Sequence, residues 1–152
     1  MQQKILTADK LEIRNWPCNP ICSLCNSQPE TALHLSLNCT YARQVWEIIS
    51  SWSHNIVQVP EMDIGSIQEW WNKNVERVPK DQKRLKAAVM IYTAWHIWNE
   101  RNRRIFTSTA LQPPDVARMI REDMSLRARA CGHPQLHFKQ NEQEQLLIII
   151  KF

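Results

Sequence analysis

The segment that decides the fold reads, from Pro17 to Thr40, PCNPICSLCNSQPETALHLSLNCT. Its prolines and weak hydrophobic periodicity predict an irregular, tightly turned segment with a short helix around residues 31–37. Such a segment needs a cross-link to hold its shape. Its cysteines and its histidine are the side chains able to supply one, so their spacing matters most.

Four side chains of this segment have the spacing of metal ligands. The Cys22-x-x-Cys25 pair puts two thiols on one turn, where both sulfurs reach one tetrahedral site at the Zn–S distance of ~2.3 Å. His34 and Cys39 follow with four residues between them, within the usual spacing of a second ligand pair. Three thiolates and one imidazole make a closed, soft site, which favours structural zinc. We therefore predict one structural zinc ion on these four residues.

The spacing of the second pair also limits the helix between them. On a continuous helix, two positions five residues apart are rotated by about 140° from each other. The helix that carries His34 should therefore end before Cys39, and the polar neighbours Asn38 and Thr40 suit such a break.

Other interpretations of these residues are open. Free cysteines are often small buried side chains without a metal. Cys18, four residues before Cys22, is an alternative ligand, although an ordinary partly buried thiol is the favoured interpretation. Cys131 and His133 form a much weaker candidate pair, with no second pair nearby. His54 and His96 are lone histidines, which we interpret as packed or solvated.

Composition and periodicity predict a mainly α fold of about five helices with an N-terminal irregular zinc knuckle. Only 2 Gly stand against 7 Trp in 152 residues, which argues against Gly-rich turns and phosphate-binding loops. The expected helices cover residues 8–15, 40–52, 66 to just before 79, 80–106 and 113–130. Expected core stripes are Val45, Trp46, Ile49 and Trp52, then Leu85, Ala88, Tyr92, Trp95, Asn99 and Phe106, then Val116, Ile120 and Met124.

The expected domain organisation is a single zinc-binding helical domain over residues 1–130, with its knuckle at 17–40 and its helical part at 40–130. Residues 131–152 form a polar tail with a short apolar run near its end. That run is too short for a membrane span, and no signal peptide is visible. An odd count of five cysteines fits a disulfide framework badly. We therefore expect an intracellular protein, nuclear or cytoplasmic, with no membrane partner.

The net charge of +4 is unevenly distributed along the chain. Residues 80–130 hold 11 Lys and Arg against 5 Asp and Glu, a net +6, whereas the remainder holds 8 against 10, a net −2. A basic half of this kind attracts RNA or DNA. The arginines expected to contact phosphates are Arg101, Arg103, Arg104, Arg118, Arg121, Arg127 and Arg129.

Two other interpretations of the basic half stand beside nucleic-acid binding. The arginines can equally form a solvated helical face above a tryptophan core. Alternatively, the chain is a zinc-stabilised helical module whose Trp-bearing surface binds a protein partner or a second copy. A steep salt dependence of RNA or DNA binding separates nucleic-acid binding from the protein-binding alternative.

Two ordered motifs together resemble a known family. The first combines Trp16-Pro17, Cys22-Ser23-Leu24-Cys25, Glu30-Thr31-Ala32-Leu33-His34-Leu35, Cys39 and Ala42-Arg43-Gln44-Val45-Trp46. The second is WHIWNERNRRIF at residues 95–106. In this combination the chain resembles the zinc-binding domain that follows the reverse transcriptase of plant LINE-type retrotransposons, over roughly residues 5–130.

The resemblance implies a module that assists reverse transcription, by gripping the template or by organising the C-terminal end of the full protein. It assigns the ligand role to Cys22, Cys25, His34 and Cys39 alone. Polymerase activity does not carry over, because two-metal nucleotidyl transfer needs clustered carboxylates and the only adjacent acidic pair is Glu122-Asp123. Zinc-bound thiolates are also poor nucleophiles. We expect no catalytic activity and no small-molecule substrate.

Overall fold

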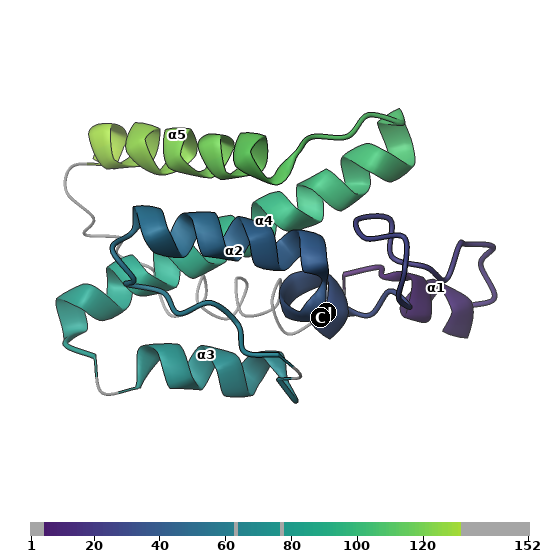
Figure 1. Ribbon diagram of the computed structural model, residues 1–152, viewed down its shortest axis with the longest axis horizontal. Coiled ribbons are helices and arrows are strands. Elements are labelled where there is room, and N and C mark those ends of the chain that lie inside the picture. The colour runs from purple at the N-terminus through teal and green to yellow at the C-terminus, as the bar shows by residue number, and fades with distance from the viewer. Residues whose placement is uncertain (1–4, 63, 77, 132–152) are drawn as a thin grey trace.

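The computed structural model describes residues 5–62, 64–76 and 78–131 (Figure 1). Over these residues the chain is mainly helical and forms no strand, which confirms the predicted fold class. The elements are α1 (Ala8–Ile13), the π-helix η1 (His34–Asn38), α2 (Thr40–Trp52), α3 (Ile67–Val75), α4 (Lys80–Thr107) and α5 (Pro113–Cys131). The predicted tail, with its apolar run, lies almost entirely outside the described residues.

The long helix α4 organises the rest of the structure. It contacts α2, α3, α5 and η1, and α2 in turn contacts α5 and η1. In Figure 1, α4 runs diagonally behind α2, with α5 along the top of the view and α3 along the bottom. The N-terminal segment with α1 lies at the right of the view. The zinc-knuckle segment therefore sits at one end of a helical bundle.

The core is centred on two tryptophans from different helices. Trp46 of α2 and Trp70 of α3 meet edge to face, with ring centroids 4.8 Å apart. Both side chains are buried, and an aromatic pair of this geometry stabilises a core beyond its buried area. Other fully buried apolar side chains around them include Val45, Ile49, Val57, Val89, Met90, Ile97, Val116 and Ile120.

Three residues of the predicted core stripes are exposed instead. Trp52, the last residue of α2, is 38% exposed, and Trp95 and Phe106 of α4 are 42% and 76% exposed. For Trp95 and Phe106 the prediction was wrong because α4 packs against several neighbours at different points of its length, whereas Trp52 lies at the exposed C-terminal end of α2. The buried side of α4 changes along the helix, so one continuous stripe does not describe it.

The start of α3 follows the predicted capping motif. The Ser66 hydroxyl accepts a hydrogen bond from the backbone N–H of Glu69 at 3.0 Å. We expect Ser66→Ala to lower the free energy of unfolding by about 1 kcal/mol, because that N–H loses its partner. Urea unfolding measures the loss. The matched control is Ser51→Ala, at an exposed position inside α2, and an equal loss in both variants would contradict the capping role.

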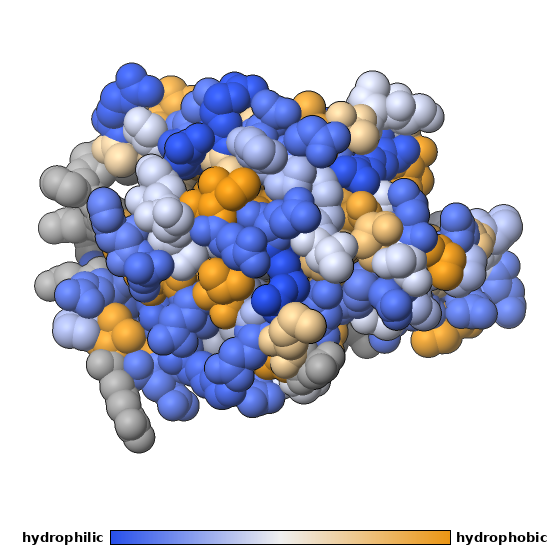
Figure 2. Space-filling view, viewed as in Figure 1, coloured by the Kyte–Doolittle hydropathy of each residue, from blue (hydrophilic) through white to orange (hydrophobic). Residues whose placement is uncertain are grey.

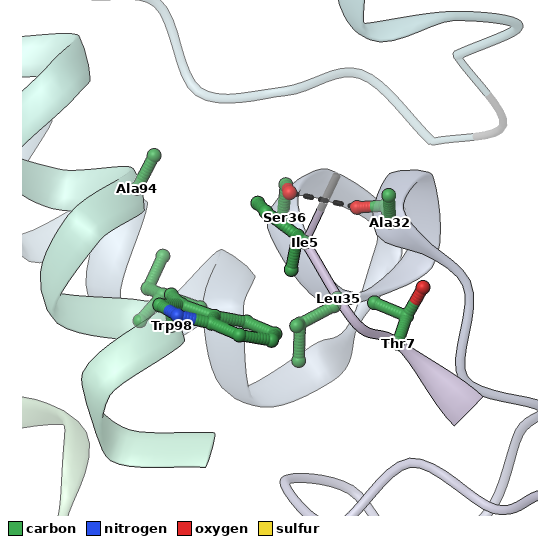
Figure 3. Close-up of a pocket in the computed structure, with 8 residues that line it drawn as sticks. Ile5, Thr7, Ala32, Leu35, Ser36, Ala94 and Trp98 are labelled. Carbon is green, nitrogen blue, oxygen red and sulfur yellow. Dashed lines mark hydrogen bonds between the residues drawn. The ribbon is translucent and has the colours of Figure 1, made fainter. Parts of the chain in front are cut away.

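A small cavity lies between α4 and the residues around η1 (Figure 3). Its volume is about 10 Å³, and Trp98 points toward Leu35 across it. The Ser36 hydroxyl at its edge donates to the Ala32 carbonyl oxygen at 2.7 Å. A space of this size accommodates about one water molecule, so it is not a ligand site.

Among the described helices, none has the length and apolarity to cross a membrane.

Candidate metal centre

The first ligand pair sits on a closed turn. Residues Ile21 and Pro29 form an isolated antiparallel bridge at its base. Inside it, the Cys22 N–H donates to the Gln28 carbonyl at 2.8 Å, and the Asn26 N–H donates to the Cys22 carbonyl at 2.8 Å. Asn26 takes a left-handed conformation, with φ of 53°, which asparagine tolerates better than most residues. The turn thus directs both thiols to one side.

The second ligand pair is brought together by a π-helical turn. The N–H of Cys39 donates to the carbonyl of His34 at 2.7 Å, an i to i+5 bond, and η1 ends at Asn38. Cys39 is extended, with φ of −65° and ψ of 132°. The prediction that the helix ends before Cys39 is confirmed. The wider π turn also brings position 39 back beneath position 34, and π turns of this kind recur at functional sites.

The four candidate ligand atoms form one compact cluster. The sulfurs of Cys22, Cys25 and Cys39 and a ring nitrogen of His34 all lie within 4.8 Å of one another. The Cys22 and Cys39 sulfurs are 3.9 Å apart, and the Cys25 sulfur is 3.3 Å from His34 Nε2. Tetrahedral Zn–S bonds of ~2.3 Å place two sulfurs about 3.8 Å apart, so the cluster fits zinc. The sulfur separation is far too long for a disulfide.

The two buried thiols shift each other's pKa in opposite directions. A hydrogen bond from Cys39, against the effect of burial, lowers the pKa of Cys22 to about 3, with help from His34 and from the N–H groups of Leu24 and Cys25. The same bond raises the pKa of Cys39 far above its usual range, and burial adds to the effect. The pair behaves as one thiolate bonded to one thiol, and a bound cation would replace the shared proton.

The other two ligands also favour negative sulfur. Burial acts to raise the pKa of Cys25, but hydrogen bonds from Ser27, His34 and Gln28 together outweigh it, and the pKa is lowered. The pKa of His34 is raised, chiefly because its ring hydrogen-bonds the Cys22 sulfur and also the Cys25 sulfur. These sulfurs therefore hold negative charge against a positive partner, which is the role of Zn²⁺ in a thiolate site.

Burial of the cluster indicates a closed site. Cys22 and Cys39 are fully buried, and Cys25 and His34 are half-buried. Four protein ligands complete the tetrahedral shell of zinc and leave no position for water or substrate. A closed set of four protein ligands is typical of structural zinc sites.

Glu30 is a buried residue of the knuckle whose role the ligand spacing does not reveal. Its side chain is 2% exposed, and its Oε1 lies 2.7 Å from Arg101 Nη2, itself on a residue 4% exposed. The same oxygen accepts the Ala8 N–H at 2.9 Å. Glu30 thus ties the knuckle to α1 and to α4 at once. The sequence feature that could have indicated this role is the position of Glu30 in the Glu-Thr-x-x-His-Leu motif. Of the residues in that motif, only the histidine is a candidate metal ligand.

The seven arginines expected to contact phosphates fall into two groups. On α4, Arg101 pairs with Glu30, and both Arg103 and Arg104 pair with the fully buried Glu100. Their charges are largely satisfied within the protein. On α5, the arginines lie at or near the surface, and those with no ion pair among the described residues are Arg121, Arg127 and Arg129. The remaining one, Arg118, pairs with Asp115 and Glu122.

The remaining candidates lie apart from the cluster. Cys18 is exposed, and its thiol contacts the Ala8 carbonyl at 3.5 Å. His54 is exposed, and His96 is buried with its Nε2 2.8 Å from an Asp123 carboxylate oxygen. The side chains of the last pair, Cys131 and His133, lie outside the described part of the chain.

The fold and the site define a helical protein with three cysteines and one histidine positioned to hold a metal ion. Residues 1–46 match the family model described as zinc-binding in reverse transcriptase. The match confirms, for this part of the chain, the resemblance to a zinc-binding domain of reverse transcriptases and, with the ligand cluster, indicates zinc as the ion. It contains all four ligands and ends within α2, so the second motif at residues 95–106 lies beyond it. Neither curated proteins nor solved structures matched the chain.

Proposed function

We propose that the protein is a non-catalytic zinc-binding module derived from the reverse transcriptase of a plant LINE-type retrotransposon. The observation that carries this proposal is the cluster of Cys22, Cys25, His34 and Cys39, with ligand atoms within 4.8 Å of one another. In the proposal, residues 1–130 form one domain, with the knuckle at 17–40 and the helical part at 40–130, and residues 131–152 form a tail. Elemental analysis of the purified chain tests it: one zinc ion per chain is expected, and none in reducing buffer would contradict it.

The zinc ion in this proposal holds the irregular segment together. Three thiolates and Zn²⁺ carry a formal charge of −1, because −3 and +2 sum to −1. A mildly anionic centre is a poor contact for phosphate. The knuckle is therefore a folding device, and any nucleic-acid surface has to lie elsewhere.

The nucleic-acid surface in this proposal lies on the C-terminal half of α5 and the neighbouring face of α4. Arg127 Nη1 lies 3.3 Å from the Tyr92 hydroxyl, and His96 contacts Asp123, so these two stretches are side by side. Trp95 belongs to the same turn of α4 and is 42% exposed. Cations beside an exposed indole are suited to a single strand, because phosphates pair with the cations and bases stack on aromatic rings.

A triple variant tests this surface. Replacing Arg121, Arg127 and Arg129 with Gln should weaken binding of a short single-stranded RNA and of the DNA of the same sequence. The slope of log K against log salt should fall by about 2, because each lost phosphate contact on a single strand contributes ~0.7. Fluorescence anisotropy across a salt series measures the slope.

The matched control removes the same charge from other helices. It carries Lys10→Gln, Arg14→Gln and Lys73→Gln, on or beside α1 and α3. This control should keep most of the affinity. An equal loss of affinity in both triple variants would mean that net charge alone determines binding. No binding at low salt would favour the protein-binding alternative.

Figure 2 does not favour that alternative, because the apolar side chains on the face shown lie in small separate groups.

A further inference from the structure

We propose that Arg104, on α4, is an outer-shell residue of the metal centre that orients the Cys22–Cys25 turn and strengthens its hold on the ion. The inference rests on the proposed zinc-binding function and names a residue 65 positions beyond the last ligand, Cys39. Outer-shell groups fix the orientation of metal ligands and change metal affinity, although they do not touch the ion.

The contact joins α4 directly to the ligand turn. Arg104 Nη1 donates to the carbonyl oxygen of Leu24 at 2.9 Å and to that of Ser23 at 3.1 Å. These are the two residues between the ligands Cys22 and Cys25. One guanidinium nitrogen therefore contacts two of the three peptide groups between Cys22 and Cys25.

The same two peptide groups face the Cys22 sulfur with their other ends. The carbonyl of Ser23 and the N–H of Leu24 belong to one peptide, and the carbonyl of Leu24 and the N–H of Cys25 belong to the next. Hydrogen bonding by both N–H groups contributes to the lowered pKa of the Cys22 thiol. A cation on the carbonyl side polarises each peptide and makes its N–H a better donor, because linked hydrogen bonds reinforce one another. Arg104 thus acts on the Cys22 thiolate through two peptide bonds.

The guanidinium is held rigidly in this position. Its Nε lies 2.9 Å from Glu100 Oε1, on a side chain that is 0% exposed. Its Nη2 donates to the Leu111 carbonyl at 3.3 Å, and its Cζ lies 4.6 Å from the centre of the Tyr41 ring. Because these contacts hold all three guanidinium nitrogens, Arg104 cannot readily turn away from the ligand turn. Its charge also lies on the side of a zinc–thiolate centre with a formal charge of −1.

Arg103 supplies the matched control. It pairs with the same buried carboxylate, with Arg103 Nη1 2.5 Å from Glu100 Oε2. Among the described residues it has no hydrogen bond to the ligand turn. Replacing Arg103 therefore removes a partner of Glu100 but leaves the turn untouched, whereas replacing Arg104 removes both.

The experiment compares zinc affinity in full-length wild type, Arg104→Gln and Arg103→Gln. Competition with a chromophoric zinc chelator gives the dissociation constants, and circular dichroism of the zinc-loaded proteins checks the fold. We expect Arg104→Gln to bind zinc about 10- to 100-fold more weakly than wild type, the usual effect of removing an outer-shell partner. Arg103→Gln should stay within about threefold of wild type, because its contact does not reach the turn.

A second readout separates the outer-shell role from a general loss of stability. Cobalt substituted for zinc reports the thiolates through its sulfur-to-metal charge-transfer bands. These bands should shift in Arg104→Gln, because weaker N–H donors leave more electron density on the Cys22 sulfur, and should not shift in Arg103→Gln. If Arg104→Gln fails to fold, the test uses Arg104→Lys instead. Lysine keeps the positive charge but lacks the rigid, planar set of donors of the guanidinium. This variant should also show weaker zinc binding and shifted bands.

The outcomes distinguish this inference from the proposed function. Wild-type affinity and unshifted cobalt bands in the folded Arg104 variant would overturn the role of Arg104 while leaving the zinc module intact. Equal losses in the Arg103 and Arg104 variants would also overturn it, because the effect would then belong to Glu100. A wild-type chain that binds no zinc would instead overturn the proposed function itself.

Discussion

Replacing Cys25 with serine should release the zinc ion and unfold the N-terminal third of the protein. The variant removes one of four ligands from a segment that has no strand and only the five-residue η1 as helix between residues 17 and 39. In small zinc modules the apparent free energy of binding is about 10–16 kcal/mol, and most of it serves as folding free energy. Elemental analysis should give one zinc per wild-type chain and none in the variant. Hydrogen exchange should show loss of protection at Cys39 and Leu35, whose amides are hydrogen-bonded.

The matched control for this experiment is Cys18→Ser. Cys18 is a fourth thiol of the same segment, but it is exposed and lies outside the ligand cluster. Its replacement should leave the zinc content and the exchange protection unchanged. Loss of zinc in Cys18→Ser would overturn the ligand assignment, and retention of zinc in Cys25→Ser would do the same.

The second large effect should come from Glu30→Ala, which we expect to lower the free energy of unfolding by about 3–5 kcal/mol. The substitution leaves Arg101 charged at 4% exposure without its carboxylate, and it removes the acceptor of the Ala8 N–H. Removing one partner of a buried ion pair costs this much, because the remaining charge stays desolvated. Urea unfolding of the zinc-loaded protein measures the loss.

Two further variants complete this test. Glu12→Ala removes an exposed acid from α1 and should change the free energy of unfolding by less than about 0.5 kcal/mol. The double variant Glu30→Leu with Arg101→Leu should recover much of the loss, because an apolar pair avoids the desolvation of two charges. A loss below about 1 kcal/mol in Glu30→Ala would show that Arg101 finds another partner or reaches solvent.

Much of the architecture was predictable from local sequence. The longest helix was expected at residues 80–106 and is found at Lys80–Thr107, and α2 covers the predicted 40–52. The ligand cluster was predictable for the same reason, since both of its pairs lie within one short segment. Local spacing and capping are properties of neighbouring residues, so they can be read without knowing the rest of the fold.

The function of the arginines was not predictable in this way. Arg101 and Arg104 lie in a basic stretch of the kind that phosphate-binding helices carry. In the structure, however, Arg101 contacts Glu30, and Arg104 contacts the turn of Ser23 and Leu24. These partners lie 71 to 81 residues away in sequence. A count of charges cannot separate cations facing solvent from cations facing a buried carboxylate, because only packing decides which face is covered.

The sequence by itself determined the helical class, the order of the helices and the four residues able to hold zinc. The tertiary structure alone decided how the knuckle is supported: by Glu30 on Arg101, by Glu100 on Arg104, and by Arg104 on the ligand turn. The reason is physical. Metal ligands on a tight turn meet through local geometry, whereas a buried charge finds its partner only when distant segments pack together and exclude water.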